Sequence, residues 1–281
     1  MTETNFIIMK TLQNHIILYD AECPMCQMYT KAFTQTGMLD NNGRASYQDM
    51  PAEACALVNR QRAVNEIALV NTQTWEVSYG VESLFKVFGH NLPVLKPLFT
   101  FGSFVWLMRK VYAFISYNRR VIIPAGNTDV GAIQPTFRLS YRLLYLVFTW
   151  LLVGLILTGY AHLLTGLVPL GNAYREYLIC GGQVLFQGII ISLYAPAKRW
   201  NYLGNMMTIS LAGALLLLPV MLLAKFMVLN ALVCTVCFMG VAGLMLLEHI
   251  RRTKLLELGW LLTSSWIIYR LLVLFLIFKF N

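Results

Sequence analysis

The sequence predicts a small α/β domain at the N-terminus followed by an all-α transmembrane helical bundle of about five spans. Only 12% of the 281 residues are charged and 58% are hydrophobic, whereas a soluble globular protein carries roughly 25% charged residues. The missing charge is confined to the second half, where long apolar runs are separated by short polar breaks from about Ser140 onward. The first 138 residues hold most of the acids and amides and have the composition of a soluble domain.

In the first 90 residues, strand-like and helix-like segments follow one another in a definite order. Short β-rich runs predict strands, and Gly37, Pro51 and Gly89 lie where helices are expected to end or begin. The expected elements are a strand at 15–20, a helix at 23–37, a strand at 45–50, a helix at 51–64, a hairpin at 65–80 and a helix at 81–90. This order is that of a thioredoxin-like α/β domain.

The composition changes between Pro124 and Pro135, where the segment PAGNTDVGAIQP has the Gly, Pro and Asn content of a connector. We therefore expect a thioredoxin-like domain at 1–124, a linker at 125–138 and a transmembrane helical domain at 139–281.

Residues 98–118 carry apolar side chains at helical spacing, interrupted by Arg109 and Lys110. The pattern predicts an amphipathic helix packed on the N-terminal domain. The alternative is a helix lying in the membrane interface, which Trp106 and the neighbouring basic residues favour.

Five apolar segments have the length of about 20 residues that a bilayer requires. They are 141–160, 177–195, 203–223, 227–247 and 259–279, and only Pro219 and Lys225 interrupt the third and fourth. One set of alternate ends carries Arg119, Arg120, Arg138, Arg142, Lys198, Arg199, Arg251, Arg252 and Lys254, and the other carries Arg175, Lys225 and Lys279. Because loops rich in Lys and Arg stay cytoplasmic, we expect a multi-pass protein of the cell (inner) membrane. Its N-terminal domain would be cytoplasmic and its C-terminus outside.

The formal net charge of +9 comes mainly from these basic residues beside apolar spans. It therefore indicates the lipid bilayer as a partner and not nucleic acid. The first fifteen residues contain an apolar run of only four residues, too short for a signal peptide. We expect the N-terminal domain to remain on the side where it is made.

The segment Cys23-Pro24-Met25-Cys26 directly follows the first strand and opens the first helix. A thiol at a helix N-terminus faces unpaired backbone N–H groups and the positive end of the helix dipole, and both stabilise its thiolate. Cys23 would then attack a disulfide and Cys26 would resolve the mixed disulfide. The alternatives are half of a zinc site, for which only Cys55, His15 and His90 are at hand, and inert buried thiols. We expect no metal.

The residues Tyr19-Asp20-Ala21-Glu22-Cys23-Pro24-Met25-Cys26 resemble the signature of the DCC family of thiol-disulfide oxidoreductases, named for Asp-x-x-Cys-x-x-Cys. The segments 79–84 and 115–120 also resemble parts of that domain, so the resemblance covers residues 15 to about 122. It implies a thioredoxin-like fold and a redox pair at Cys23 and Cys26, with Asp20 as the motif acid. Ala21 replaces the usual Gly, and the strand at 66–70 is not preceded by the proline found in thioredoxin itself.

Asp20 lies at the C-terminal end of the first strand, beside the cysteines. Its carboxylate could exchange a proton with them during the reaction. The alternative is that it caps the following helix, since Asp is a favoured cap residue.

A second CxxC pair, Cys234 and Cys237, lies within the fourth span, and Cys180 falls at a similar depth in the second. The sequence LNALVCTVCF faintly resembles the span-borne CxxC of the vitamin K epoxide reductase family, whose dithiol exchanges electrons with a bound quinone. That family's loop cysteines have no counterpart here. The alternative is that these small apolar residues only serve helix packing.

Three further polar side chains lie inside predicted spans. Arg270 sits near the middle of the fifth span, where an unpaired charge is costly, and Gln183 and Gln187 share one face of the second. They could bind a quinone head group, or they could simply bond neighbouring helices. Glu248 and His249 lie at the inner end of the fourth span, where we expect them to be solvated.

Together these features predict a membrane-anchored thiol-disulfide oxidoreductase. It would use Cys23 and Cys26 on a protein thiol or disulfide, with a relay to Cys234, Cys237 and a quinone as an extension. The alternative is a non-catalytic subunit or assembly factor of a membrane complex, whose N-terminal domain only docks partners.

Overall fold

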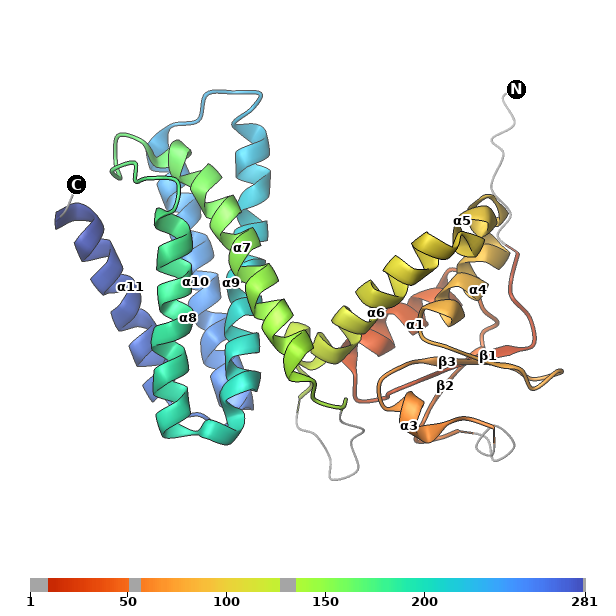
Figure 1. Cartoon of the computed structure of the whole chain (residues 1–281). Helices are drawn as coiled ribbons and strands as arrows, with labels where there is room; N and C mark the ends of the chain where they lie inside the picture. The colour runs from red at the N-terminus through yellow and green to blue at the C-terminus, as the bar shows by residue number, and fades with distance from the viewer. Residues whose placement is uncertain (1–9, 51–56, 127–134, 280–281) are drawn as a thin grey trace, which may run out of the picture. The chain divides into compact units, whose positions relative to one another are not determined.

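The computed structural model describes residues 10–50, 57–126 and 135–279 (Figure 1). The chain divides into two compact units, Met1–Arg138 and Leu139–Asn281, and each is described by itself. Most of the expected linker, residues 127–134, lies outside the described residues.

The first unit is built on a mixed four-stranded sheet with the order β2-β1-β3-β4. β1 (His15–Tyr19) pairs in parallel with β2 (Arg44–Ser46) and antiparallel with β3 (Ala68–Asn71), which forms a hairpin with β4 (Val77–Tyr79). The parallel pair requires a crossover connection, which contains α1 (Pro24–Gln35). The predicted thioredoxin-like arrangement is thus confirmed.

Successive residues of β1 point to opposite faces of the sheet and belong to two different cores. Ile17 packs against Val87 of α4 (Val81–Asn91). Leu18 packs in a separate core that includes a residue of α3 (Arg60–Ala63). Both residues have no exposed surface. Because both faces of β1 are buried, the position of the residues that follow it is fixed.

Two predicted helix ends in this unit can be compared with the structure. α1 ends at Gln35, and Gly37 follows with a φ of +73°, the left-handed conformation in which glycine commonly ends a helix. The helix predicted at 51–64 is only partly described, because residues 51–56 lie outside the described part of the chain.

A 3-10 turn, η1 (Pro93–Leu95), and α5 (Lys96–Thr100) lead into the long helix α6 (Gly102–Ile122). α6 begins later than predicted, because the chain bends by 89° between α5 and α6. Its inner face packs on the domain, since Tyr112 joins the core on the α1 side of the sheet. Its outer face carries Arg109 and Lys110 beside apolar side chains, among them Trp106, which is 61% exposed.

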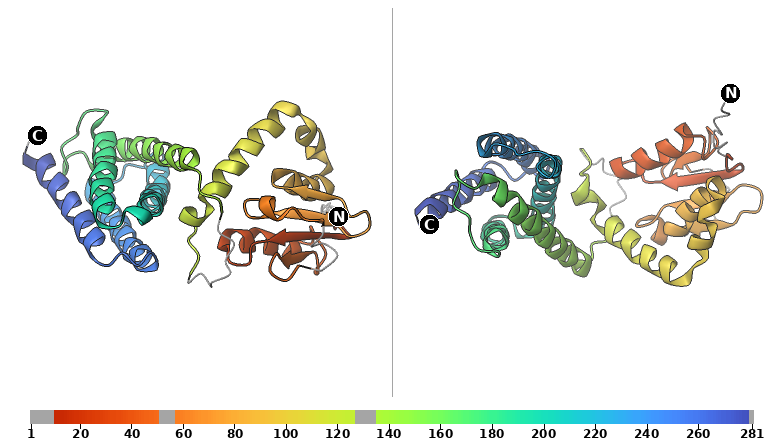
Figure 2. Two further views of the ribbon diagram at one scale, coloured as in Figure 1. Left: turned by 60° about the horizontal axis from the view of Figure 1, so that its bottom comes forward. Right: turned by 90° about the horizontal axis from the view of Figure 1, so that it is seen from above.

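Five helices form the second unit and lie side by side as a bundle (Figure 2). Each is long and apolar enough to cross a membrane, so the described residues contain the five predicted candidate spans, and the stretch from Pro93 to Ile122 would add a sixth only as one bent span. They are α7 (Leu139–Ala161), α8 (Arg175–Tyr194), α9 (Arg199–Leu223), α10 (Ala231–Leu255) and α11 (Leu261–Lys279). Pro219 lies inside α9, as it lies inside the predicted span 203–223, and the helix ends at Leu223, the predicted end of that span.

A hydrogen-bonded polar cluster lies inside this bundle. The Tyr202 hydroxyl donates to Gln187 Oε1 (2.9 Å) and lies 3.1 Å from His249 Nε2, while Gln187 Nε2 donates to Ser265 Oγ (3.1 Å). His249 Nδ1 lies 3.2 Å from Thr263 Oγ1. His249 is only 1% exposed. The expectation of a solvated His249 is therefore wrong, because α10 continues past residue 247 and carries this side chain into the bundle.

The cluster predicts the effect of removing one hydroxyl group. Tyr202→Phe should lower the free energy of unfolding by about 1 kcal/mol, because two buried partners lose a hydrogen bond in an apolar surrounding. The measurement is reversible unfolding of the full chain in mixed micelles. Tyr174→Phe, at a residue that is 72% exposed, is the matched control. Equal stability of the two variants would contradict the prediction.

Candidate functional site

The paired cysteines lie where β1 passes into α1. Cys23 is the N-cap residue of α1, and Pro24 takes the first helical position, where its missing N–H costs nothing. The Cys23 N–H donates to the Asp20 carbonyl (3.0 Å), which closes a tight turn after the strand. The Cys26 N–H donates to Cys23 Sγ (3.4 Å). The Cys23 sulfur is therefore the side-chain acceptor that caps the N-terminus of α1.

This placement makes the two thiols chemically different. The pKa of Cys23 is lowered to about 6, first by its hydrogen bond with Cys26 and then by the positive charge of Arg119, against the opposing effects of burial and of Asp20. The pKa of Cys26 is raised, by the same hydrogen bond and by burial. Both are free thiols. The arrangement supplies one thiolate and one protonated thiol near neutral pH, the combination that thiol-disulfide exchange requires.

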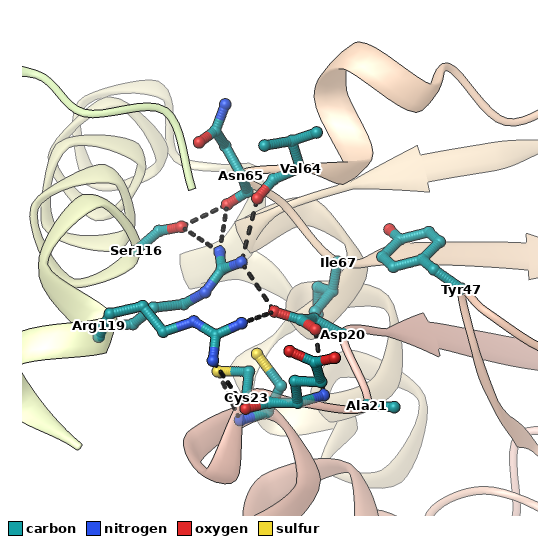
Figure 3. Close-up of polar contacts among 12 residues, drawn as sticks. Asp20, Ala21, Cys23, Tyr47, Val64, Asn65, Ile67, Ser116 and Arg119 are labelled. Atoms are coloured by element: carbon teal, nitrogen blue, oxygen red, sulfur yellow. Dashed lines mark hydrogen bonds and ion pairs between the residues drawn. The ribbon is translucent and has the colours of Figure 1, made fainter. Parts of the chain in front are cut away.

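Asp20 is held by two arginines from the C-terminal end of α6 (Figure 3). Its Oδ2 atom accepts from Arg120 Nη2 (2.9 Å) and from Arg119 Nη2 (3.3 Å). Its Oδ1 atom accepts from the Glu22 N–H (3.1 Å). The Asp20 and Arg119 side chains are only 2% and 6% exposed. These ion pairs are buried, so losing one partner would leave a costly unpaired charge.

The same arginines also fix the backbone on both sides of the dithiol. Arg119 donates to the carbonyls of Val64 (3.0 Å) and Asn65 (3.4 Å), just before β3. Arg120 donates to the carbonyl of Glu22 (2.8 Å), directly before Cys23. α6 thus connects two loops that are far apart in the sequence.

Side chains from other parts of the domain hydrogen-bond the backbone of the loop before β3, at residues 64–67. Besides the contacts of Arg119, Ser116 Oγ donates to the Asn65 carbonyl, and Tyr47 OH donates to the Glu66 carbonyl (2.9 Å). The Ile67 N–H donates to Tyr112 OH (3.1 Å). In place of the proline that thioredoxin has here, side chains position this loop.

A cavity of about 190 Å³ opens beside the second cysteine. Its lining includes Cys26, the rings of Tyr29, Tyr47 and Tyr112, and Arg119. Cys26 keeps 6% of its surface exposed, whereas Cys23 keeps none. Solvent therefore reaches the dithiol from the Cys26 side, through a largely apolar opening.

The two alternatives for Asp20 can now be compared with its position. The capping place at the start of α1 belongs to Cys23, so Asp20 does not cap this helix. Both carboxylate oxygens are already bonded to fixed donors. Proton transfer would therefore require one of these bonds to open first. Sequence reasoning missed the arginines as site residues, although the segment 115–120 was noted for its resemblance.

Within the described residues, no group of three or more His, Cys, Asp or Glu side chains could hold a metal ion. Cys55, one of the few further ligands considered for zinc, lies outside them.

Cys180 and Cys234 lie in two separate packing clusters of the second unit, and Cys237 belongs to neither. Cys180 packs with Val153 and Ala214, whereas Cys234 packs with Tyr160, whose hydroxyl donates to the Cys234 carbonyl (2.7 Å). Cys234 has no exposed surface. Cys180 and Cys234 are therefore not packing neighbours. A group of three neighbouring thiols would require them to be.

The three polar candidates in the spans differ in their partners. Gln187 bonds Tyr202 and Ser265, as a helix-packing residue does. Gln183 is 3% exposed, and neither its Oε1 nor its Nε2 atom has a hydrogen-bond partner among the described residues. The buried Arg270 Nε atom has none there either, although its guanidinium lies 5.3 Å from the centre of the Trp266 ring.

A mixed sheet with two cysteines at the start of the first helix defines a dithiol protein of the thioredoxin class, joined here to a unit of five membrane-spanning candidates. The model of the DCC1-like thiol-disulfide oxidoreductase family matches residues 17–123, and the N-terminal domain of this chain belongs to that family. The match ends just after the arginines of α6. Comparisons with curated proteins and with solved structures gave no match.

The lowered pKa of Cys23 predicts a pH profile. In the folded, reduced full chain, alkylation of Cys23 by iodoacetamide should rise with pH through a midpoint near 6 and level off above it. In the unfolded chain the midpoint should lie near 8.5. The folded state then binds fewer protons than the unfolded state between these values. The ionised Cys23 thiol therefore stabilises the folded state fully above the unfolded pKa of about 8.5, and this stabilisation is lost as the pH falls through about 6.

Peptide mapping by mass spectrometry separates the two thiols in this experiment. Cys26, whose pKa is raised, serves as the internal control and should stay unmodified at neutral pH. A folded-state midpoint near 8.5 for Cys23 would contradict the assignment of the thiolate.

Proposed function

We propose that this protein is a membrane-anchored thiol-disulfide oxidoreductase that acts on a protein partner through Cys23 and Cys26. The observation that carries the proposal is the capping position of Cys23, which receives the Cys26 N–H and has a pKa of about 6. In this scheme the Cys23 thiolate attacks a partner disulfide, and a mixed disulfide forms as one partner sulfur leaves. Cys26 then loses its proton, attacks Cys23 and releases the partner as a thiol.

Access to Cys23 is part of this proposal. Its side chain has no exposed surface, so binding of the partner must uncover it. We propose that Arg120, which holds the carbonyl just before Cys23, moves in this step. The cavity beside Cys26 offers room for an apolar side chain of the partner, since tyrosine rings line it. We propose that filling this cavity accompanies the opening.

The competing function is a docking domain without catalysis, in a subunit or assembly factor of a membrane complex. The exposed apolar side chains of α6, such as Trp106 and Leu107, would suit such a role. The two functions differ in whether the domain exchanges disulfides at all, which the next experiment measures.

Serine variants of the two cysteines should behave differently. Cys23→Ser should abolish exchange with a protein disulfide, because the attacking thiolate is gone. Cys26→Ser should accumulate mixed disulfides through Cys23, because the resolving thiol is gone. Non-reducing gels and mass spectrometry of the full chain measure both outcomes. Cys180→Ala in the second unit is the control and should behave as wild type. Exchange that persists in Cys23→Ser would exclude the proposed role.

A finer proposal extends the electron path to Cys234, Cys237 and a quinone. Its support is the pair of buried groups between α8 and α11, Gln183 and the Nε atom of Arg270, that lack partners among the described residues. A buried amide without hydrogen bonds is costly, and a quinone carbonyl would accept from either group.

Two hydrogen bonds fix the register of the helices that carry these groups. Tyr269 OH donates to the Ile179 carbonyl (2.8 Å), and Gln187, about two turns further along α8, bonds Ser265, about one turn before Tyr269 on α11 (3.1 Å). Antiparallel helices held at these points bring the two groups without partners to neighbouring levels. We propose this level as the place of the quinone head group.

The thiols of α10 should then respond to the quinone pool. Alkylation of membranes with the pool reduced or oxidised, followed by mass spectrometry, should show Cys234 and Cys237 as thiols in the first state and as a disulfide in the second. The i, i+3 spacing makes them neighbours, although the helix must loosen to meet the strict geometry of a disulfide. If both thiols stay reduced in both states, Cys234 and Cys237 serve only helix packing and the proposed electron path is wrong.

We also propose that the N-terminal domain faces the cytoplasm and that the C-terminus lies outside, from the distribution of Lys and Arg. A reporter enzyme that is active only outside the cytoplasm should work when fused after Asn281 or after Lys225 and fail when fused after Arg199. For a reporter active only in the cytoplasm, the fusion after Arg199 should work and the fusion after Asn281 should fail. Activity of that cytoplasmic reporter after Asn281 would overturn the orientation.

A further inference from the structure

Exposed apolar side chains follow one another along η1, α5 and the first half of α6. We call residues 93–115 the α5–α6 arm. The exposed fractions reach 89% at Val94 and 61% at both Phe101 and Trp106, and the set comprises Val94, Leu98, Phe101, Trp106, Leu107, Val111 and Ile115. Single exposed apolar residues are normal on a protein surface, whereas a continuous series of them marks a binding surface.

The shape of the arm is fixed by aromatic packing. Phe85 of α4 stacks on Phe99 of α5, with ring centres 4.5 Å apart, and lies 5.9 Å from the ring of Phe104 of α6. The three rings hold the 89° bend between α5 and α6 (Figure 1). The exposed apolar side chains are therefore presented by a rigid corner of the domain.

The arm is attached to the N-terminal domain along its inner face. Tyr112 packs in the domain core, and its hydroxyl accepts from the Ile67 N–H (3.1 Å). Arg109 pairs with Glu82 of α4 at 2.5 Å. A helix held in this way cannot cross a bilayer without unfolding these contacts, but its outer face remains free to lie on a surface.

Basic residues accompany the apolar side chains. From Ser83 to Thr128 the sequence contains no Asp or Glu. Lys96 and Lys110 are exposed, and neither forms an ion pair with an acid of the described residues. Lys110 Nζ lies 5.8 Å from the centre of the Trp106 ring. Trp106, Leu107, Lys110 and Val111 are three or four residues apart, so they share one face of α6.

A face with tryptophan and lysine among aliphatic side chains has the chemistry of the membrane interface. Tryptophan rings favour the headgroup level, and lysine is attracted to anionic headgroups. A bilayer is also within reach of the arm, because only residues 123–138 separate α6 from α7, the first candidate span. An extended chain of that length covers at most about 60 Å.

We propose that the α5–α6 arm binds the surface of an anionic lipid bilayer, with Trp106 and Leu107 in the headgroup region and Lys96 and Lys110 beside lipid phosphates. The surface is separate from the dithiol, since Arg119 lies about 20 Å further along α6 than Trp106. The proposal is independent of the proposed exchange activity.

Quenching of Trp106 by brominated lipid tests the contact on the full chain. The chain is placed in nanodiscs of phosphatidylcholine and phosphatidylglycerol in equal parts, with ordinary acyl chains or with chains brominated near the headgroup. Subtracting the emission of Trp106→Phe from that of wild type isolates Trp106 and removes the tryptophans of the second unit. Trp106 emission should fall at least about twofold in the brominated discs, because interfacial side chains lie at this depth.

Trp75, which is 42% exposed beside the β3–β4 turn, is the matched control. Its emission, isolated in the same way with Trp75→Phe, should not change in brominated discs. Unquenched Trp106 emission would overturn the proposal. If acrylamide in the buffer also fails to quench Trp106, a protein surface covers the arm instead, either another copy of the chain or the second unit.

The charge dependence tests the choice of an anionic bilayer. Lys96→Gln combined with Lys110→Gln should restore most of the Trp106 emission in brominated discs, because each lysine loses its attraction to anionic headgroups. Each value is taken relative to ordinary discs, which cancels any direct effect of Lys110 on the ring. Lys31→Gln, at an exposed lysine of α1, is the control and should equal wild type.

The wild-type chain gives the same information without a substitution. Raising the salt concentration, or replacing phosphatidylglycerol by phosphatidylcholine, should restore Trp106 emission as the double variant does. Quenching that depends on neither salt nor lipid charge would overturn the anionic part of the proposal. If the double variant does not fold, these two measurements on wild type still decide.

Discussion

The ion pairs between Asp20 and the arginines of α6 hold the N-terminal domain together at its reactive end. Breaking a buried pair of this kind costs about 3–5 kcal/mol, because a charge is left without a partner. The exposed pair of Glu76 and Lys86 on the same domain contributes far less to stability, because solvent screens its charges. One acid after β1 therefore determines where the end of a helix about 100 residues later must lie, and with it the surroundings of the dithiol.

The second unit is organised by polar contacts of a different kind. Tyr202, Gln187 and His249 bond one another across three helices and are all buried. Such contacts orient helices whose surfaces are otherwise uniformly apolar. Among the described residues, the Gln183 amide and the Nε atom of Arg270 make no such bond, which is why we propose them as donors to a quinone head group.

Local patterns were enough to predict much of this protein. The pattern of apolar residues predicted the strands and the five spans, and the spacing of Cys23 and Cys26 at a helix start predicted the candidate site, because each depends on neighbours in the sequence. The pairing of Asp20 with Arg119 depends on folding across about 100 residues, and no local pattern carries it. His249 was misjudged for a related reason: its burial depends on α9 and α11, which pack around the end of α10.

The central claim is that Asp20 and Arg119 stabilise the domain through each other. A double-mutant cycle with Asp20→Asn and Arg119→Gln tests it most directly, read as hydrogen-exchange protection of the β1 amides in the full chain. Each single variant should cost about 3 kcal/mol, and the double variant should cost at least about 1 kcal/mol less than their sum. Costs that simply add, within about 0.5 kcal/mol, would show that the two side chains act independently and would contradict this account.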